Sequence, residues 1–219
     1  MIKASITYPM SLSIDYPDRK LNRLTTFFRL FIAIPVVWFL VILANQISLV
    51  LFACITLAWE AAEWRWGYLL LGFIALPTAL MLLFRQKYPR WWFGWNLNMT
   101  KFFARIWAYL CLLTDEFPSI DEDQAVHLDI PYPNAKEELN RWLPLLKWIL
   151  AIPHWVILFF LHIGVLVVAI IAWFAILCTG RYPKSLFNFV VNVLRWFLRV
   201  GAYAIILTTD CYPAFRLSE

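Results

Sequence analysis

Long apolar runs, separated by short charged stretches, dominate the pattern of hydrophobic and polar positions along the chain. Residues 30–59 and 67–84 contain no charged side chain, and residues 148–180 have only His154, His162 and Cys178 as ionisable groups. A transmembrane helix needs about 20 apolar residues. These runs therefore predict helices that cross a lipid bilayer, with spans at about Val36–Trp59 and His154–Leu177.

One proline lies near the start of the first run and one near the start of the last, at Pro35 and Pro153. Proline lacks a backbone donor and disfavours helix just before it. We therefore expect a lead-in helix near the interface, a bend, and then the span. The alternative is a re-entrant hairpin in each run, with turns near Asn45-Gln46 and Gly164.

Two further apolar segments carry polar residues at helical spacing. In Leu186–Leu207 the intervals are 4, 3 and 4 residues, and Trp91–Leu113 repeats the 3, 4 part. A strand would need alternation at every second residue, so both segments predict amphipathic helices. The polar stripe residues are Asn98, Lys101, Arg105, Asn188, Asn192, Arg195 and Arg199.

Three short stretches alternate between apolar and polar residues instead, at Met10–Asp15, Ala125–Ile130 and Ala214–Leu217. This alternation predicts short strands. Open strand edges cannot face lipid. We therefore expect these strands to lie outside the hydrocarbon and to pair with each other in a small cap at one surface.

The composition agrees with a membrane protein. Apolar residues make up 63% and charged residues 15% of the 219 residues, against about 45–50% and about 25% in soluble domains. The net charge is +5, and the basic residues stand beside apolar segments. Anionic lipid headgroups are therefore the expected counter-charge, and no basic–aromatic module for nucleic acid is present.

Motifs recur in the same order in the two halves of the chain, at offsets of 116 to 118 residues in the first part of each half and of 94 to 95 residues in the later part. The drop of 24 residues corresponds to about one helical span, so the first half is expected to hold an extra transmembrane helix within Ala44–Phe84. The recurring motifs are Leu12–Pro17 with Leu128–Pro133, Leu21–Arg23 with Leu139–Arg141, Ala33–Pro35 with Ala151–Pro153, Lys87–Arg90 with Arg181–Lys184, and Leu113–Pro118 with Thr208–Pro213.

The predicted fold is an all-α integral membrane protein, with two divergent repeats of transmembrane plus amphipathic helices and short extramembrane β-strands. Residues 1–118 form the first repeat, residues 119–138 an acidic connector with a strand, and residues 139–219 the second repeat. Five spans result if the striped helices cross the membrane, and three if they lie flat.

The second half also resembles a known family. Its motifs include Ala151–His154, Ala172–Leu177, Thr179–Pro183 and Leu186–Val191, followed by Asp210 with Tyr212-Pro213. This pattern resembles the bacterial membrane proteins classed as domain of unknown function 4389, over nearly all of Leu139–Leu217, and the first half resembles a weaker copy. The family ends with two prolines before a phenylalanine, whereas this chain has Pro213-Ala214-Phe215. The resemblance implies a multi-pass membrane protein and no particular reaction.

The polar stripes are the first candidate site. Either they lie on lipid phosphates as the basic faces of interfacial helices, or they line a cavity between two spanning helices. Asp115 and Asp210 follow the striped helices and form the second candidate. They could pair between the halves, Asp115 with Arg199 and Asp210 with Arg105, or they could simply end the helices at a turn.

The function expected from these features is that of a non-enzymatic accessory or scaffolding subunit, which binds lipid in the bacterial cytoplasmic membrane. Its partners would be anionic lipids and either another membrane protein or further copies of itself. The alternative is a small transporter or lipid-handling protein with a polar groove between the repeats. The sequence contains no catalytic motif, and His154 and His162 are about 12 Å apart along a helix, so no metal or cofactor is expected.

Overall fold

The structure is a computed structural model that describes residues 8–17, 21–29, 72–120 and 122–217. This part of the chain is mostly helical and contains one two-stranded sheet, which agrees with the predicted fold class at that level. The predicted span Val36–Trp59 lies outside it. In chain order the elements are β1 (Ser11–Ile14), a helical segment at residues 23–29, α3 (Gly72–Arg85), α4 (Arg90–Leu110), β2 (Val126–Asp129), α5 (Leu143–Thr179) and α6 (Lys184–Ala204).

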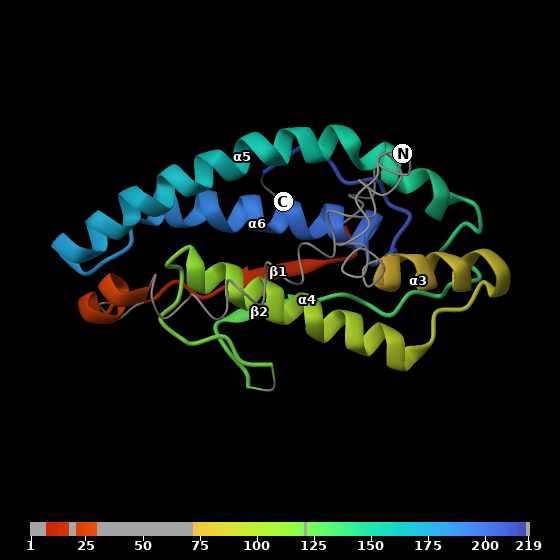
Figure 1. Ribbon diagram of the computed structural model, residues 1–219, viewed down its shortest axis with the longest axis horizontal. Helices are drawn as coiled ribbons and strands as arrows, with labels where there is room; N and C mark the ends of the chain where they lie inside the picture. The colour runs from red at the N-terminus through yellow and green to blue at the C-terminus, as the bar shows by residue number, and fades with distance from the viewer. Residues whose placement is uncertain (1–7, 18–20, 30–71, 121, 218–219) are drawn as a thin grey trace, which may run out of the picture.

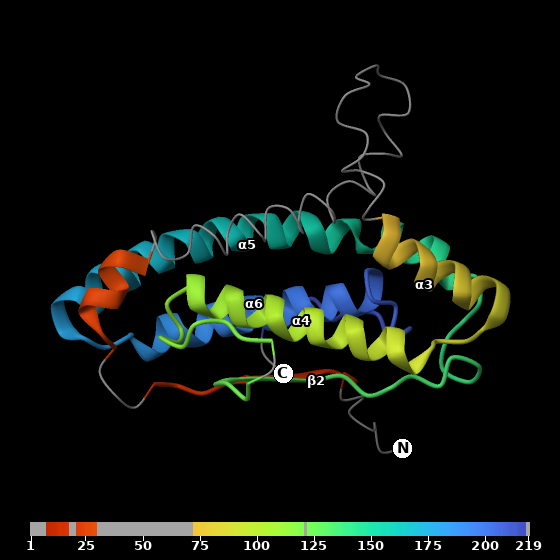
Figure 2. The same ribbon diagram turned by 60° about the horizontal axis from the view of Figure 1, so that its bottom comes forward.

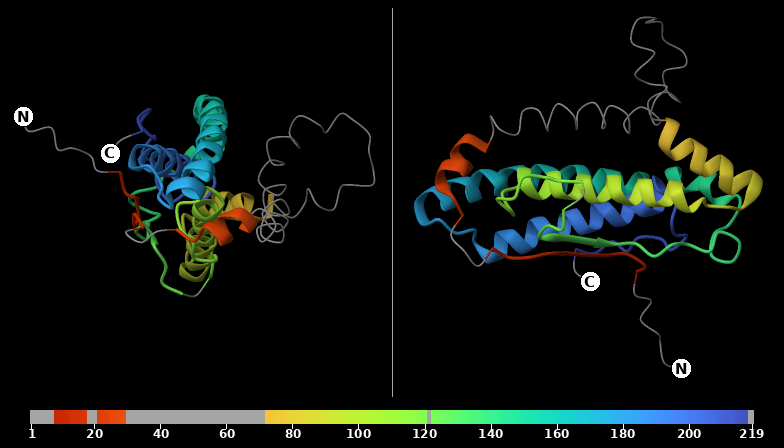
Figure 3. Two further views of the ribbon diagram at one scale, coloured as in Figure 1. Left: turned by 90° about the vertical axis from the view of Figure 1, so that its left-hand side faces the viewer. Right: turned by 90° about the horizontal axis from the view of Figure 1, so that it is seen from below.

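The elements form three layers. Figure 2 shows α3 and α5 in the upper layer, α4 and α6 in the middle layer, and the two strands in the lowest. Helices α5 and α6 run side by side along the molecule (Figures 1 and 3). In this view α4, α5 and α6 all extend along the molecule above the sheet.

The two striped helices form as predicted, and each begins at a Tyr-Pro corner. Pro89 precedes α4 and Pro183 precedes α6, both at φ −62° in an extended conformation. Before the second corner, Gly180 ends α5 in the left-handed conformation at φ 73°, where a residue without Cβ is least strained. The proline ring then fixes the direction in which the next helix starts.

The strands predicted at Met10–Asp15 and Ala125–Ile130 are present as β1 and β2, and their predicted pairing is confirmed. They are antiparallel, with Leu12 opposite Leu128. Leu12 and Leu128 are buried under the helices, whereas Ser13 and His127 face outward. The sheet therefore has one apolar face toward the helices and one polar face away from them.

The strand predicted at Ala214–Leu217 is wrong, because these residues have no strand conformation. This tail packs on α5 instead. The ring of Phe215 stacks on that of His154, with centroids 3.9 Å apart, and the Tyr212 hydroxyl donates to the Leu150 carbonyl. Contacts with a helix thus replace the expected edge pairing.

The predicted break at Pro153 is also wrong, because α5 is one continuous, gently arched helix from Leu143 to Thr179 (Figure 1). Contacts with α6 and its C-terminal end hold both sides of the proline: Trp148 Nε1 donates to the Ala204 carbonyl, and Trp196 Nε1 donates to His154 Nδ1. Gly164 lies within α5 beside Phe189 of α6, so the alternative hairpin turn at Gly164 is wrong as well.

Helix α5 is the one helix in the described ranges that is long and apolar enough to cross a membrane. Its 37 residues correspond to about 55 Å, more than a hydrocarbon core of about 30 Å. Only 17% of its most apolar window is buried inside the protein. The core helix of a soluble domain would be mostly buried, so the low burial of α5 agrees with a helix that contacts lipid.

Candidate lipid-facing surface and paired polar sites

The exposed side of α5 is a continuous apolar face. Ala151, Leu158, Val165, Ala172 and Ile176 are buried on the opposite side, at the spacing of one helical stripe. The patch is far longer than the scattered apolar residues of an ordinary soluble surface. Its exposed residues are Leu145, Leu146, Ile149, Ile152, Val156, Ile157, Phe159, Phe160, Ile163, Leu166, Val167, Ile170, Ile171 and Phe174.

The C-terminal half of the α6 polar stripe faces β1 and the residues just before it. Arg195 donates from Nη2 to the Leu12 carbonyl at 2.9 Å and from Nη1 to Asn192 Oδ1 at 2.9 Å. One helical turn further, the buried Arg199 guanidinium lies over the ring of Tyr8, and the Tyr8 hydroxyl donates to the Arg199 carbonyl. The structure therefore engages Arg195 and Arg199 in holding the strand, and of this stripe Asn188 is the exposed member.

The polar stripe of α4 likewise includes an arginine that binds a backbone carbonyl of a distant segment. Arg105 is buried and donates from Nη1 to the Ser119 carbonyl at 2.6 Å, which secures the start of the connector. Lys101 is half-buried, and Asn98 is exposed.

A cleft of about 560 Å³ lies beside the C-terminal end of α6, and none of the stripe residues lines it. Its walls include Met10, Tyr132, Glu138 and Asp210. The cleft therefore lends no support to a groove between the two stripes.

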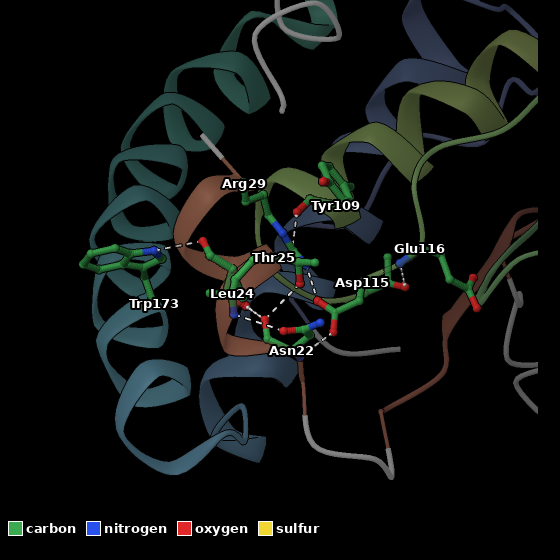
Figure 4. Close-up of polar contacts among 10 residues, drawn as sticks. Asn22, Leu24, Thr25, Arg29, Tyr109, Asp115, Glu116 and Trp173 are labelled. Atoms are coloured by element: carbon green, nitrogen blue, oxygen red, sulfur yellow. Dashed lines mark hydrogen bonds and ion pairs between the residues drawn. The ribbon is translucent and has the colours of Figure 1, made fainter. Parts of the chain in front are cut away.

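Asp115 is the centre of a first polar site (Figure 4). Its carboxylate forms an ion pair with the guanidinium of Arg29 and accepts a hydrogen bond from the backbone nitrogen of Asn22 at 3.0 Å. Arg29 also donates to the Tyr109 carbonyl and lies 4.6 Å above the Tyr109 ring centroid. Burial lowers the pKa of Arg29, and the negative charge of Asp115 opposes that shift.

Asp210 is the centre of a second polar site. Its Oδ1 lies 2.7 Å from Lys147 Nζ, and its Oδ2 accepts a hydrogen bond from the backbone nitrogen of Asn140 at 2.6 Å. Lys147 is fully buried, donates to the Thr209 carbonyl and lies 5.0 Å above the ring centroid of Tyr203. The Lys147 ammonium group is therefore surrounded by the Asp210 carboxylate, the Thr209 carbonyl and the Tyr203 ring.

The two sites are built from corresponding positions. Asn22 and Arg29 precede Asn140 and Lys147 by 118 residues, and Tyr109 precedes Tyr203 by 94. Even a local turn matches, since Asn22 Oδ1 accepts from the Leu24 nitrogen and Asn140 Oδ1 from the Trp142 nitrogen. Each aspartate therefore meets a cation that lies earlier in its own half of the chain.

This arrangement differs from the pairing expected from the sequence, in which Asp115 would meet Arg199 and Asp210 would meet Arg105. Arg29 and Lys147 were not among the predicted site residues. The signal that could have found them is the offset of 118, which aligns Arg29 with Lys147 just as it aligns Asn22 with Asn140.

The polar sites have the character of structural ion pairs. Within the described residues no group of three or more His, Cys, Asp and Glu side chains is placed to hold a metal ion. His154 and His162 make separate contacts, His154 with Trp196 and Phe215, and His162 with the Leu158 carbonyl.

In the part of the chain that the structure describes, these features define a mostly helical protein with one candidate membrane helix and a two-stranded sheet whose polar face points away from the helices. Residues 142–216 match the family described as Domain of unknown function (DUF4389). The match contains α5, α6 and Asp210, and it supports the resemblance seen in the second half of the sequence. No curated protein and no solved structure matched the chain.

Proposed function

We propose that this protein is a non-enzymatic scaffolding subunit of the bacterial cytoplasmic membrane, in which the exposed face of α5 lies within one leaflet. The observation that carries the proposal is the opposition of two faces. The apolar face of α5 forms one side of the molecule, and the polar face of the sheet forms the other (Figure 2). Lipid would cover the first face, and the aqueous side would receive the second.

The position of the sheet argues against α5 crossing the bilayer. Arg195 binds Leu12 of β1, and its neighbour Trp196 binds His154, so the sheet lies level with the middle part of α5. His154 is about 10 Å along the helix from the centre of α5, whereas half of a hydrocarbon core is about 15 Å. A perpendicular α5 would therefore carry the sheet into the hydrocarbon.

Such a position would be costly for the sheet. It exposes the ionisable side chains of Asp15, His127 and Asp129, and charged groups within a bilayer cost several kcal/mol each. Two strands also leave backbone edges that lipid cannot satisfy. A helix α5 that lies parallel to the membrane plane avoids both costs, because the sheet then faces water.

The distribution of charge indicates which lipids would surround the molecule. Exposed basic residues occupy the corners at the two ends of the molecule, Lys87 and Arg90 before α4 and Arg181 and Lys184 before α6. Exposed Asp15 and Asp129 lie on the sheet. Arg90 and Lys184 lie over the rings of Tyr132 and Tyr16, which follow the strands, so the corners mark the two ends of the molecule. In the proposal the exposed cations at these ends meet anionic headgroups around the embedded face, and the bias of basic residues toward the cytoplasm favours the cytoplasmic leaflet.

The proposal also includes the duplication of one module. The matched polar sites support it, as do the two Tyr-Pro corners and the equal lengths of α4 and α6, 21 residues each. We assign residues 1–118 and 139–219 to the two copies, joined by the acidic connector. The scaffold would present the outer face of the sheet to a partner membrane protein or to another copy of the whole chain.

Mild-detergent purification from native membranes tests the proposed function. We expect anionic lipid and a second membrane protein, or further copies of this chain, to be recovered in a fixed ratio. Asp15→Asn with Asp129→Asn should reduce the recovery of the protein partner and leave bound lipid unchanged. The result that would overturn the proposal is a chain that purifies alone, without bound lipid, at every detergent concentration that keeps it folded.

A further inference from the structure

The two strands cover helices of the opposite half of the chain. Strand β1 belongs by sequence to the first half, yet Arg195 and Arg199 of α6 hold it through Leu12 and Tyr8. Strand β2 lies in the connector directly before the second copy, where its motif Leu128–Pro133 matches Leu12–Pro17 of the first half, and it packs on α4 of the first half. Each half thus gives its strand to the other.

Two tyrosines fasten the exchanged strands at their ends. The Tyr16 hydroxyl, just after β1, donates to the Tyr182 carbonyl at the corner before α6. The Tyr132 hydroxyl, just after β2, donates to the Tyr88 carbonyl at the corner before α4. Both bonds connect the strand of one half to the Tyr-Pro corner of the other.

The surroundings of these tyrosines correspond as well. Lys184 Nζ lies 5.2 Å from the Tyr16 ring centroid, and the guanidinium of Arg90 lies 5.4 Å from that of Tyr132. Phe187 packs edge-on against Tyr16 at 5.1 Å, as Phe93 packs against Tyr132 at 5.2 Å. The contacts of Tyr16 with the corner before α6 therefore correspond, residue for residue, to the contacts of Tyr132 with the corner before α4.

The strand register maps onto itself under the repeat. Leu12 and Leu128 correspond at an offset of 116 and lie directly opposite each other. The pair Ser11 with Asp129 then corresponds to the pair His127 with Ser13, which is also formed. A register with this property is expected where two identical units meet about a two-fold axis.

We infer that the interface between the two halves is a homotypic docking surface, whose fitting partner is a second copy of the same module with its strand exchanged. This inference rests on the proposed duplication. The chain is then a covalent pair of modules, and the covalent link ahead of β2, at residues 119–125, is dispensable for their association. In the polar sites, by contrast, the ion pairs stabilise each module from within.

Cleavage of the full-length chain tests the inference. A protease site is inserted between the exposed residues Glu122 and Asp123, the chain is cut in native membranes, and a tag on the C-terminal fragment is captured after solubilisation. We expect the N-terminal fragment to be recovered with it in equal amount. Separation of the fragments under conditions in which the uncut chain stays folded would overturn the inference.

A matched pair of variants sharpens the test. Tyr16→Phe with Tyr132→Phe removes both inter-half hydroxyl bonds and should speed the separation of the cut fragments about tenfold or more. Tyr212→Phe removes a hydroxyl that bonds Leu150 within the same half and should leave separation unchanged. Equal rates for both variants would contradict strand exchange. Recovery of bound lipid with the uncut chain tests the proposed function separately.

Discussion

Lys147 and Asp210 form a 2.7 Å ion pair in which the lysine has no exposed surface and the aspartate side chain retains 21% of its own. Asp210→Asn should therefore destabilise the protein by about 3–5 kcal/mol, because it leaves a buried cation without its counter-charge. Chemical denaturation in detergent, followed by tryptophan fluorescence, measures the loss. Asp129→Asn on the exposed sheet face serves as the control and should change stability by less than about 0.5 kcal/mol.

Asp115→Asn should have an effect of similar size, since Arg29 has 4% of its side-chain surface exposed and pairs with Asp115 in the corresponding place. The same denaturation experiment compares the two aspartates directly. A loss at Asp210 with no loss at Asp115 would show that the two polar sites are not equivalent.

A charge on the apolar face of α5 should weaken membrane retention. Phe160 is 65% exposed near the centre of that face, and arginine there would cost up to about 3 kcal/mol of insertion free energy. We expect Phe160→Arg to shift the chain from the membrane fraction to the soluble or aggregated fraction after an alkaline wash. Ser13→Arg, on the sheet, should remain in the membrane fraction; equal retention of both variants would contradict a lipid-facing α5.

The basic corners should select anionic lipid. Arg181→Gln with Lys184→Gln should lower the ratio of phosphatidylglycerol to phosphatidylcholine retained from mixed micelles, by about fivefold for each cation removed. Quantitative lipid analysis of the purified variant measures this ratio. Retention of phosphatidylcholine alone should stay constant, and an unchanged ratio would mean that these cations do not face headgroups.

The cysteines should differ sharply in reactivity. Cys111 is buried and Cys211 exposed, and burial raises the pKa of the Cys111 thiol. Because the thiolate is the reactive form, Cys111 should react with maleimide at pH 8 at least about tenfold more slowly than Cys211. The comparison uses two single-cysteine variants, each with the other three cysteines replaced by alanine, and equal rates would contradict the burial of Cys111 at the C-terminal end of α4.

The spacing of polar and apolar residues correctly predicted the helices and strands whose side chains follow a single helical or strand period. The polar stripe intervals predicted α4 and α6, and the alternation around Leu12 and Leu128 predicted both strands and their pairing. Spacing alone could not give the direction that the stripes face. Arg195 was expected at lipid or a cavity, yet it binds a strand carbonyl, because the strand is brought to it from far away in the sequence.

Long-range contacts account for the other differences. Pro153 predicted a bend, but tryptophan contacts on both sides keep α5 continuous. The cations of the polar sites were missed because Arg29 and Lys147 lie outside the striped helices. In the sequence, only the offset of 118 residues relates Arg29 to Lys147. That offset does not indicate which aspartate forms an ion pair with which cation.

The most direct test of the central claim is the sidedness of the two ends of α5. Arg141→Cys and Arg181→Cys flank the helix and are exposed; each is introduced into a chain whose native cysteines are replaced by alanine. A membrane-impermeant maleimide is then applied to right-side-out and inverted vesicles. A helix that lies in one leaflet predicts that both cysteines react from the same side, the cytoplasmic one. Reaction of the two cysteines from opposite sides would show that α5 crosses the bilayer and would contradict the account.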